Sequence, residues 1–359
     1  MKRLVKLLSI IFIVILLSIN LACAPKYYSR DFFFFNTQIS VVTKNRAISS
    51  EAEEKLTSLF GGLEKEFSPS EELSFTKTFN SLSVEQTMTL SSTAVEIFDL
   101  AKSCYEYSGG LFNPAVFPLV KAWSFYPDYP VLNFTPPSDN EINDLMKDEK
   151  LNFSQVSLNK NTLKKEVSGM ELDFGGILKG FAIDKSSEIL SKDGITEGYI
   201  NAGGSSLFIF ASNTLGIKHP RAQKDIPQII SVNIKGEKNL SVSTSGDYEK
   251  TYTFEGKTYS HLINPKTGYP ANTGIISATV IGAGGGFSDA ITTALCLCSH
   301  SNGENDSELF NMMRKILFDY PNAKIFVVFN DGHDKLILTN QKQGEQFTLL
   351  DKEYSVINI

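Results

Sequence analysis

The sequence contains few of the residues on which metal-binding and disulfide-rich proteins depend. Cysteine and histidine occur four times each in 359 residues, and no two cysteines are spaced as Cys-x-x-Cys. Zinc sites and disulfide frameworks need clustered or paired residues of these types, so the sequence argues against both classes. Beyond Cys23, the cysteines Cys104, Cys296 and Cys298 form an odd set, and we expect them to be small buried hydrophobic side chains.

The sequence also lacks basic runs, internal repeats and low-complexity segments. Its formal net charge is −6, with 34 Lys and Arg residues against 40 Asp and Glu residues. Because nucleic-acid binders usually carry a basic surface, this balance argues against a nucleic-acid partner. The 42% hydrophobic and 21% charged residues are typical of a globular protein, and 359 residues allow one large or two medium domains.

A long hydrophobic run occurs only at the N-terminus. Residues 7–21 are mostly apolar and follow Lys2, Arg3 and Lys6, but the run is shorter than the roughly 20 residues of a spanning helix. It ends in Leu-Ala-Cys at Cys23, which resembles a bacterial lipoprotein signal. We expect residues 1–22 to be removed and Cys23 to be acylated.

Residues 23–30 would then be a short tether. They would hold the protein on the cell membrane as a lipid-anchored, non-spanning protein that faces the periplasm or the cell exterior. Asn20 departs from the usual signal, so a plain secretory leader remains the alternative.

The rest of the chain mixes strand and helix patterns. Strands are predicted at residues 31–42, 198–211 with a break at Gly203-Gly204, 229–234, 240–244, 274–281, 323–329 and 335–338, with hairpins at 155–166 and 251–261. Helical spacing is present at residues 49–67, 86–107, 179–190, 288–298 and 307–318. Proline-rich residues 111–125 and 126–140 are predicted to be an ordered loop with a short helix and a second loop. We therefore predict an α+β fold with mixed, mostly antiparallel sheets flanked by helices, forming a single domain at residues 31–355.

A first candidate site lies at residues 171–184. The sequence Glu-Leu-Asp-Phe-Gly-Gly-Ile-Leu-Lys-Gly-Phe-Ala-Ile-Asp begins like a strand, breaks at Gly175-Gly176 and continues with helical spacing. The glycines let the backbone approach a ligand, and the first-turn N–H groups of a helix suit an anion such as a diphosphate. Lys179 adds a positive charge. A turn with glycines for packing is the alternative interpretation.

Two further segments carry candidate ligands. Asp289 and Thr293 are four residues apart, so they share one helix face, and their oxygens are hard ligands of the kind that Mg²⁺ prefers. The alternative is an aspartate that stabilises the helix dipole and a threonine bonded to its own helix. Residues 243–248 and 260–270 combine hydroxyls and glycines at strand exits, and the second of them contains His261.

Five segments are informative together: Leu-Asp-Phe-Gly-Gly-Ile-Leu-Lys-Gly-Phe-Ala-Ile-Asp, Asn-Ala-Gly-Gly-Ser, Thr-Ser-Gly-Asp-Tyr, His-Leu-Ile-Asn-Pro-Lys-Thr-Gly-Tyr-Pro and Ser-Asp-Ala-Ile-Thr-Thr-Ala. In order and spacing they resemble the motifs of the FAD:protein FMN transferases, the ApbE family. The resemblance implies that Mg²⁺ is held by Asp289, Thr293 and the backbone carbonyl of Gly176. Positions that match the flavin cleft are Phe35, Ser70, Leu111, Phe112, Asn113, Asp173, Lys179, Thr244, Ser245, Asp247, His261 and Ile263. At Ser70 the family commonly has a tyrosine that stacks on the flavin.

The resemblance also implies an activity. The protein would use Mg²⁺ to transfer FMN from FAD to a threonine hydroxyl of an acceptor flavoprotein, such as a subunit of an ion-translocating redox complex, and would release AMP. His261 and Asp289 are the expected catalytic residues. Two alternatives stay open: an FAD pyrophosphatase, suggested by Ser70, and a non-catalytic flavin-binding lipoprotein.

Overall fold

The structure, a computed structural model, describes residues 25–127, 129–223, 225–300 and 307–359. The expected signal at residues 1–22 and Cys23 therefore lie outside the described residues. In the described ranges, no helix combines the length and the hydropathy that crossing a membrane requires.

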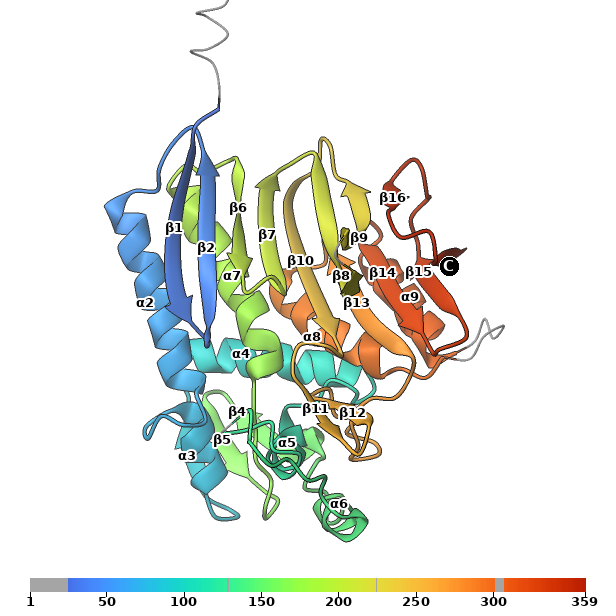
Figure 1. The fold of residues 1–359 in the computed structure, drawn as a ribbon. Helices are drawn as coiled ribbons and strands as arrows, with labels where there is room; N and C mark the ends of the chain where they lie inside the picture. The colour runs from blue at the N-terminus through green and yellow to red at the C-terminus, as the bar shows by residue number, and fades with distance from the viewer. Residues whose placement is uncertain (1–24, 128, 224, 301–306) are drawn as a thin grey trace, which may run out of the picture.

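A nine-stranded sheet forms the centre of the fold (Figure 1). Its neighbours pair antiparallel except for the last two strands, which are parallel. In spatial order the strands are β1 (Tyr27–Phe34), β2 (Thr37–Lys44), β6 (Gly198–Ala202), β7 (Ser206–Ala211), β10 (Lys238–Gly246), β13 (Ile275–Ile281), β14 (Lys324–Asn330), β15 (Lys335–Thr339) and β17 (Ser355–Asn358). The predicted α+β class with mostly antiparallel pairing is confirmed.

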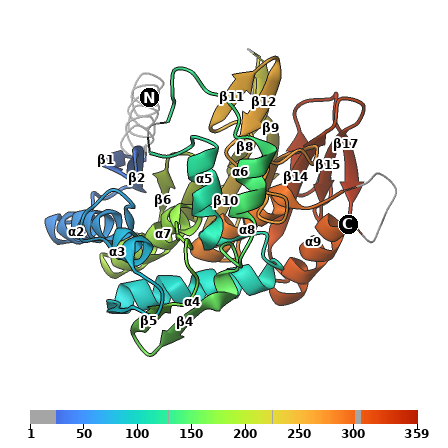
Figure 2. The same cartoon turned by 90° about the horizontal axis from the view of Figure 1, so that it is seen from below.

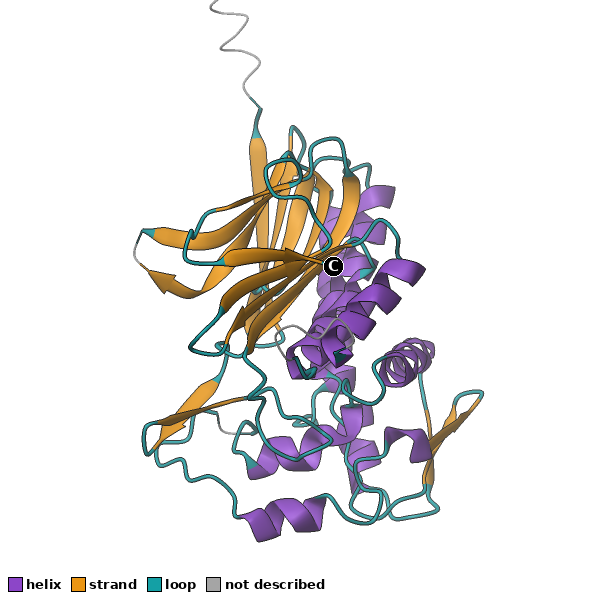
Figure 3. Ribbon diagram, turned by 90° about the vertical axis from the view of Figure 1, so that its right-hand side faces the viewer, coloured by secondary structure: helices purple, strands orange, loops and turns teal. Residues whose placement is uncertain are grey.

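Helices cover one face of this sheet, as the side view in Figure 3 shows. They are α2 (Ser50–Phe67), α7 (Gly175–Lys192), α8 (Gly285–Leu297) and α9 (Glu308–Asp319), and α4 (Ser92–Tyr107) packs on the outer side of α7 and α8. The predicted helices are therefore present, with shifted ends. Between these helices and the sheet lies the main hydrophobic core, which also contains the predicted buried cysteines Cys104, Cys296 and Cys298.

The opposite face of the large sheet packs against a small sheet. Its strands are β16 (Phe347–Leu349), β9 (Ile226–Asn233) and β8 (Thr214–Gln223). Buried Ile217, Ile230 and Phe347 of this sheet share a second hydrophobic core with Val242 and Phe326 of the large sheet. Neither β8 nor the C-terminal strands β16 and β17 were predicted from the sequence.

A lower part of the molecule carries short elements around the ends of the main helices (Figure 2). They are α3 (Phe75–Ser81), β3 (Thr87–Thr89), η1 (Pro114–Val116), α5 (Phe117–Ala122), α6 (Asp139–Leu145), η2 (Phe153–Gln155), β4 (Val156–Asn159), β5 (Thr162–Lys165), β11 (Thr251–Phe254) and β12 (Lys257–Ser260). Both predicted hairpins, β4–β5 and β11–β12, are present.

Three expectations were wrong in detail. Residues 31–42 are not one strand, because Phe35 and Asn36 have positive φ angles of 55° and 54° and form a two-residue hairpin turn. The sheet itself runs from Tyr27 to Asn358, and the expected bounds of the tether and of the domain stay predictions.

The helix expected from residue 86 begins only at Ser92, because Ser91 caps it by accepting a hydrogen bond from the N–H of Ala94. Residues 171–174 before α7 are irregular and form no strand.

Candidate functional site

Helices α7 and α8 approach closely because glycines face each other. A Cβ atom on Gly180 would lie 2.1 Å from the carbonyl oxygen of Gly285, and a Cβ atom on Gly285 would lie 2.4 Å from the carbonyl oxygen of Gly180. Neither position has room for a side chain. The two helix backbones are therefore close enough for side chains of one helix to bond the main chain of the other.

Two aspartates make these cross-helix bonds. Asp184 of α7 accepts hydrogen bonds from the N–H groups of Gly285 at 2.8 Å and Gly286 at 3.0 Å. The N-terminus of α8 has no side-chain cap of its own, so α7 supplies one. In the other direction, Asp289 of α8 accepts a hydrogen bond from the N–H of Gly180 at 2.9 Å.

The bond to Asp289 also bears on Gly176. In a regular α-helix the N–H of Gly180 donates to the carbonyl of residue 176. Here the Asp289 carboxylate accepts this N–H at 2.9 Å. The structure thus brings the Asp289 carboxylate to the helix turn that begins at the carbonyl of Gly176.

A group of hydroxyls surrounds Asp289 and the following turn of α8. Ser206 of β7 donates to the other carboxylate oxygen of Asp289 at 3.3 Å. On β10, the hydroxyl of Ser245 lies 2.9 Å from the hydroxyl of Thr292 and 3.2 Å from that of Thr293. The polar side-chain atoms of this group are all oxygens, and Mg²⁺ binds oxygen ligands.

The acidity of Asp289 fits a cation site. Burial raises the pKa of its carboxyl, and Lys179 and the N–H of Gly180 oppose that rise. Across the part of the chain that the structure describes, no three His, Cys, Asp or Glu side chains group to hold a metal by themselves. The expected ligands of a cation here are one carboxylate and neutral oxygens, those of Asp289, Thr293 and the Gly176 carbonyl, and this set stays a prediction.

Positive charge gathers beside this group. Lys179 and Lys250 both lower the pKa of Asp173 and of His261, although burial is the larger influence and raises the pKa of Asp173 overall. Asp173 also accepts a hydrogen bond from the N–H of Gly175 at 3.1 Å, which fixes the start of α7. The structure thus places Asp173 and Lys179 in one electrostatic environment with Lys250 and His261, which lie more than seventy residues further along the chain.

His261 is neutral at pH 7. Burial, followed by the charges of Lys250 and Lys179, lowers the pKa of His261 to about 4. Its Nδ1 atom is buried and has no hydrogen-bond partner among the described residues. The unused ring nitrogen can accept a proton, but the lowered pKa makes this imidazole a weaker base than an ordinary histidine.

An aromatic cluster holds the loop that carries His261. Trp123 donates from its ring N–H to the carbonyl of Gly268 at 2.9 Å, and Ile263 is buried in the same cluster. The ring of Phe125 lies 6.3 Å from that of His261, and the N–H of His261 donates to the carbonyl of Lys250 at 3.1 Å. These contacts fix the backbone and the ring direction of His261.

The remaining expected flavin residues on or next to strands lie where strands of the large sheet end, at the same end of the sheet. Phe35 is in the β1–β2 turn, and a Cβ atom on Gly203 in the β6–β7 turn would lie 2.5 Å from the hydroxyl of Thr37. The N–H of Thr244 donates to the carbonyl of Ser205 at 2.8 Å. This chain of contacts joins Phe35 to the end of β10, where Thr244, Ser245 and Asp247 lie.

Residues 111–113 reach the start of α7. The ring of Phe112 would lie 3.3 Å from a Cβ atom on Gly176, so Phe112 contacts the expected metal-binding turn, and Leu111 is buried behind it. The amide of Asn113 is used within the protein, because it accepts from the N–H of Ala115 at 2.9 Å and donates to the carbonyl of Leu151 at 2.7 Å.

Two expected site residues have partners that the sequence did not suggest. Arg221 donates to both carboxylate oxygens of Asp247 at 2.8 and 2.7 Å. The hydroxyl of the exposed Ser70 lies 2.6 Å from that of Tyr126, so an aromatic ring from the proline-rich loop lies beside the position that lacks one.

Sequence reasoning missed Asp184, Arg221, Lys250 and Tyr126. Asp184 ends the first candidate segment and Lys250 follows the Thr-Ser-Gly-Asp-Tyr segment closely, so their proximity to the motifs was the available signal. Arg221 and Tyr126 are distant from the residues they contact, and the local pattern gives no signal for them.

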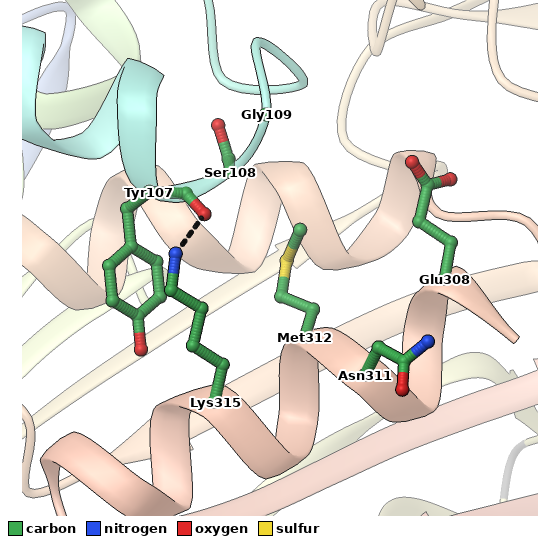
Figure 4. Close-up of a pocket in the computed structure, with 7 residues that line it drawn as sticks. All are labelled: Tyr107, Ser108, Gly109, Glu308, Asn311, Met312 and Lys315. Carbon is green, nitrogen blue, oxygen red and sulfur yellow. Dashed lines mark hydrogen bonds between the residues drawn. The ribbon is translucent and has the colours of Figure 1, made fainter. Parts of the chain in front are cut away.

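A surface hollow of about 490 Å³ lies apart from these residues, between the end of α4 and α9 (Figure 4). Tyr107, Glu308 and Lys315 are among its lining residues, and Lys315 donates to the carbonyl of Tyr107 at 2.9 Å. None of the expected site residues lines it, so we do not assign it to the site.

Comparisons with known proteins agree with this arrangement. The chain is 31% identical over 222 residues to the FAD:protein FMN transferase of Buchnera aphidicola subsp. Schizaphis graminum, which covers 61% of this chain and 64% of that protein. It is 28% identical over 264 residues to the FAD:protein FMN transferase of Klebsiella pneumoniae, covering 70% and 79%. The first match thus spans slightly less than two thirds of the relative.

Solved structures share the fold. The ApbE protein of Thermotoga maritima is 26% identical with a TM-score of 0.71, covering 85% of this chain and 94% of that one. The flavin transferase ApbE of Vibrio cholerae, at 19% identity and a TM-score of 0.71, covers 90% and 96% and is similar in fold. The sequence model of the ApbE family matches residues 35–309, well over half of the chain. The chain therefore belongs to the ApbE family.

Proposed function

We propose that this protein is a FAD:protein FMN transferase. It moves FMN from FAD to a threonine hydroxyl of an acceptor flavoprotein and releases AMP. The observation that carries the proposal is the joining of α7 and α8, which sets Asp289, Thr293 and the turn from Gly176 beside Lys179. Family membership and the activity named for two relatives support it.

The residues of this chain would bind the diphosphate of FAD by charge. Lys179 and Lys250 both lie near enough to His261 and Asp173 to lower the pKa of each. In the described ranges, no ion pair joins either lysine to a carboxylate. Two cations in one region, neither bonded directly to a carboxylate, suit a ligand with two phosphate groups.

His261 would accept the proton of the acceptor. The threonine oxygen attacks the phosphorus on the FMN side of the diphosphate, a phosphoester bond forms, and the bond from that phosphorus to the AMP oxygen breaks. The hydroxyl proton passes to the neutral imidazole of His261, and AMP leaves with the electron pair of the broken bond.

We also propose that the reaction uses Mg²⁺. Asp289, Thr293 and the carbonyl of Gly176 would hold it, and a bound Mg²⁺ would supply positive charge that neutralises the phosphate oxygens. The buried carboxylate and the surrounding hydroxyls fit such an ion. Thr292 would support Thr293 through their shared partner Ser245.

The location and the partner complete the proposal. Cys23 would carry a lipid anchor on the outer side of the cell membrane, and the acceptor would be a flavoprotein such as a subunit of an ion-translocating redox complex. Intact mass measurement of the mature N-terminus tests the anchor, because acylation adds the mass of the lipid chains to Cys23.

The activity is tested with purified protein, FAD and Mg²⁺, with and without an acceptor domain that contains a target threonine. We expect AMP release and a flavin-labelled acceptor only when Mg²⁺ and the acceptor domain are both present with FAD. AMP release without an acceptor would indicate an FAD pyrophosphatase instead. Binding of FAD with no AMP release under either condition would leave a flavin-binding protein.

A further inference from the structure

The C-terminal part of the chain, beyond the residue 309 at which the family match ends, reaches toward the proposed site. Strands β16 and β17 attach it to the small and the large sheet, respectively. Between these strands lies Asp351, an acidic residue whose exposed fraction is only 5%. A buried carboxylate needs hydrogen-bonding partners, and those of Asp351 are His219 of β8 and the backbone N–H of Glu353.

The first partner is His219, which is also buried. Its Nε2 atom lies 2.9 Å from a carboxylate oxygen of Asp351, and its Nδ1 atom accepts a hydrogen bond from the N–H of Arg221 at 3.0 Å. Because Nδ1 accepts a hydrogen bond, the ring proton lies on Nε2, which donates to Asp351.

The carboxylate therefore fixes both the direction and the tautomer of the ring. Burial alone would raise the pKa of Asp351, but the hydrogen bonds from His219 and from the N–H of Glu353 outweigh it and leave the pKa lowered.

The second step runs through an irregular part of β8. The pairing of β8 with β9 shifts register between Lys218 and Gln223. Within this interruption Pro220 has no N–H to donate, and the N–H of Arg221 goes to the ring of His219. The His219 ring thus replaces a sheet partner for Arg221.

The third step enters the proposed flavin site. The guanidinium of Arg221 holds Asp247 by two parallel hydrogen bonds of 2.8 and 2.7 Å. This paired geometry is more directional than a single contact. Asp247 lies two residues after Ser245, whose hydroxyl contacts Thr293 at 3.2 Å. A continuous set of contacts therefore leads from Asp351 to an expected metal ligand.

We propose that Asp351 is a positioning residue for the turn at residues 244–247, and that it acts through His219 and Arg221. The proposal rests on the function proposed above, because it assigns this turn to the FAD site. It gives the C-terminal segment a role in substrate binding, in addition to its packing in the two sheets.

The test measures the affinity for FAD in the presence of Mg²⁺, together with kcat and KM for FAD, in full-length variants. Asp351→Ala removes the acceptor that holds the Nε2–H of His219, and Arg221→Gln breaks the pair with Asp247. Glu353→Gln is the matched control, because Glu353 pairs with Lys335 on the surface of the same segment and only its backbone N–H reaches Asp351.

We expect Asp351→Ala and Arg221→Gln each to raise the Kd and KM for FAD about 3- to 10-fold, with a smaller change in kcat. The double variant should bind FAD no more weakly than the single variant with the lower affinity, because both changes break the same chain of contacts. Glu353→Gln should match the wild type.

Two results would overturn the proposal. One is an Asp351→Ala variant with a lower Tm but an unchanged affinity for FAD, since a purely structural role predicts that outcome. The other is a double variant whose loss of affinity equals the product of the single losses. Failure of the proposed function is separate: the wild type would then bind FAD without transferring FMN.

Discussion

Oδ2 of Asp289 accepts the backbone N–H of Gly180 at 2.9 Å, so the carboxylate expected to hold a metal also joins α8 to α7. The same side chain therefore has one oxygen in a structural bond and one oxygen near the hydroxyl of Ser206 at 3.3 Å. This relationship determines how substitutions of Asp289 should be designed.

Asp289→Ala should lower turnover more than about 100-fold, since a catalytic cation contributes several kcal/mol to stabilising the transition state. The measurement is the initial rate of AMP release at saturating FAD with increasing Mg²⁺. Asp289→Asn is the control for structure, because its amide oxygen still accepts the N–H of Gly180. Full activity in both folded variants would contradict the metal assignment.

His261→Gln should lower kcat about 10²- to 10⁴-fold if the imidazole accepts the acceptor proton. The pKa of His261 is lowered to about 4, so the wild-type ring is neutral from about pH 5 upward. The pH profile of kcat/KM should therefore fall only toward pH 4. A fall centred near pH 6.5 that disappears in the variant would contradict the buried environment of the ring.

The same lowered pKa predicts how stability depends on pH. In the unfolded chain a histidine takes up a proton near pH 6.5, whereas folded His261 does so near 4. The unfolded state thus binds more protons between these values, so this contribution to stability is present above pH 6.5 and is lost as the pH falls toward 4. Urea unfolding of the wild type and His261→Gln at several pH values measures the difference.

Asp184→Ala should destabilise the protein by about 1–3 kcal/mol, because two buried N–H groups at the start of α8 lose their acceptor. Urea unfolding monitored by circular dichroism measures the change. Glu188→Gln is a suitable control one turn further along α7, since the Glu188 side chain is 59% exposed. Equal stability of Asp184→Ala and the control would contradict the capping role.

Gly180→Ala and Gly62→Ala should change stability in opposite directions. At Gly180 an added Cβ atom would meet the carbonyl oxygen of Gly285 at 2.1 Å, so α7 and α8 must separate, at a cost of about 1–3 kcal/mol. At Gly62, inside α2, an added Cβ atom meets no atom within 4 Å, and alanine should stabilise by roughly 0.5–1 kcal/mol. Thermal unfolding compares the two, and a stable Gly180→Ala variant would disprove the close helix contact.

Ser70→Tyr should lower the rate of FAD hydrolysis relative to FMN transfer. An added aromatic ring would stack on the flavin with about 0.5–1.5 kcal/mol and help exclude water from the diphosphate. The ratio of AMP released to acceptor labelled is the measurement, with Tyr126→Phe as a control for the hydroxyl contact of 2.6 Å that Ser70 makes. An unchanged ratio would remove Ser70 from the account of specificity.

Local patterns determined much of the secondary structure. The helix predicted at residues 49–67 is present as α2, because Ser49 caps it and its apolar residues recur at helical spacing. The spacing of Asp289 and Thr293 likewise set them one turn apart on α8. Two predictions from local patterns were wrong. The aromatic residues around Phe35 predicted one continuous strand where there is a hairpin turn, and the apolar residues before Gly175 predicted a strand that is absent.

The sequence by itself determined the fold class, the family and the segments that carry the candidate ligands. Tertiary structure alone decided which groups meet: Asp289 with Gly180 across 109 residues, Asp184 with Gly285 across 101, and His219 with Asp351 across 132. The physical reason is that helix periodicity and capping depend on residues within a few positions of one another. Which N–H a buried carboxylate accepts depends instead on how closely two distant backbones pack, and at α7 and α8 the glycines set that distance.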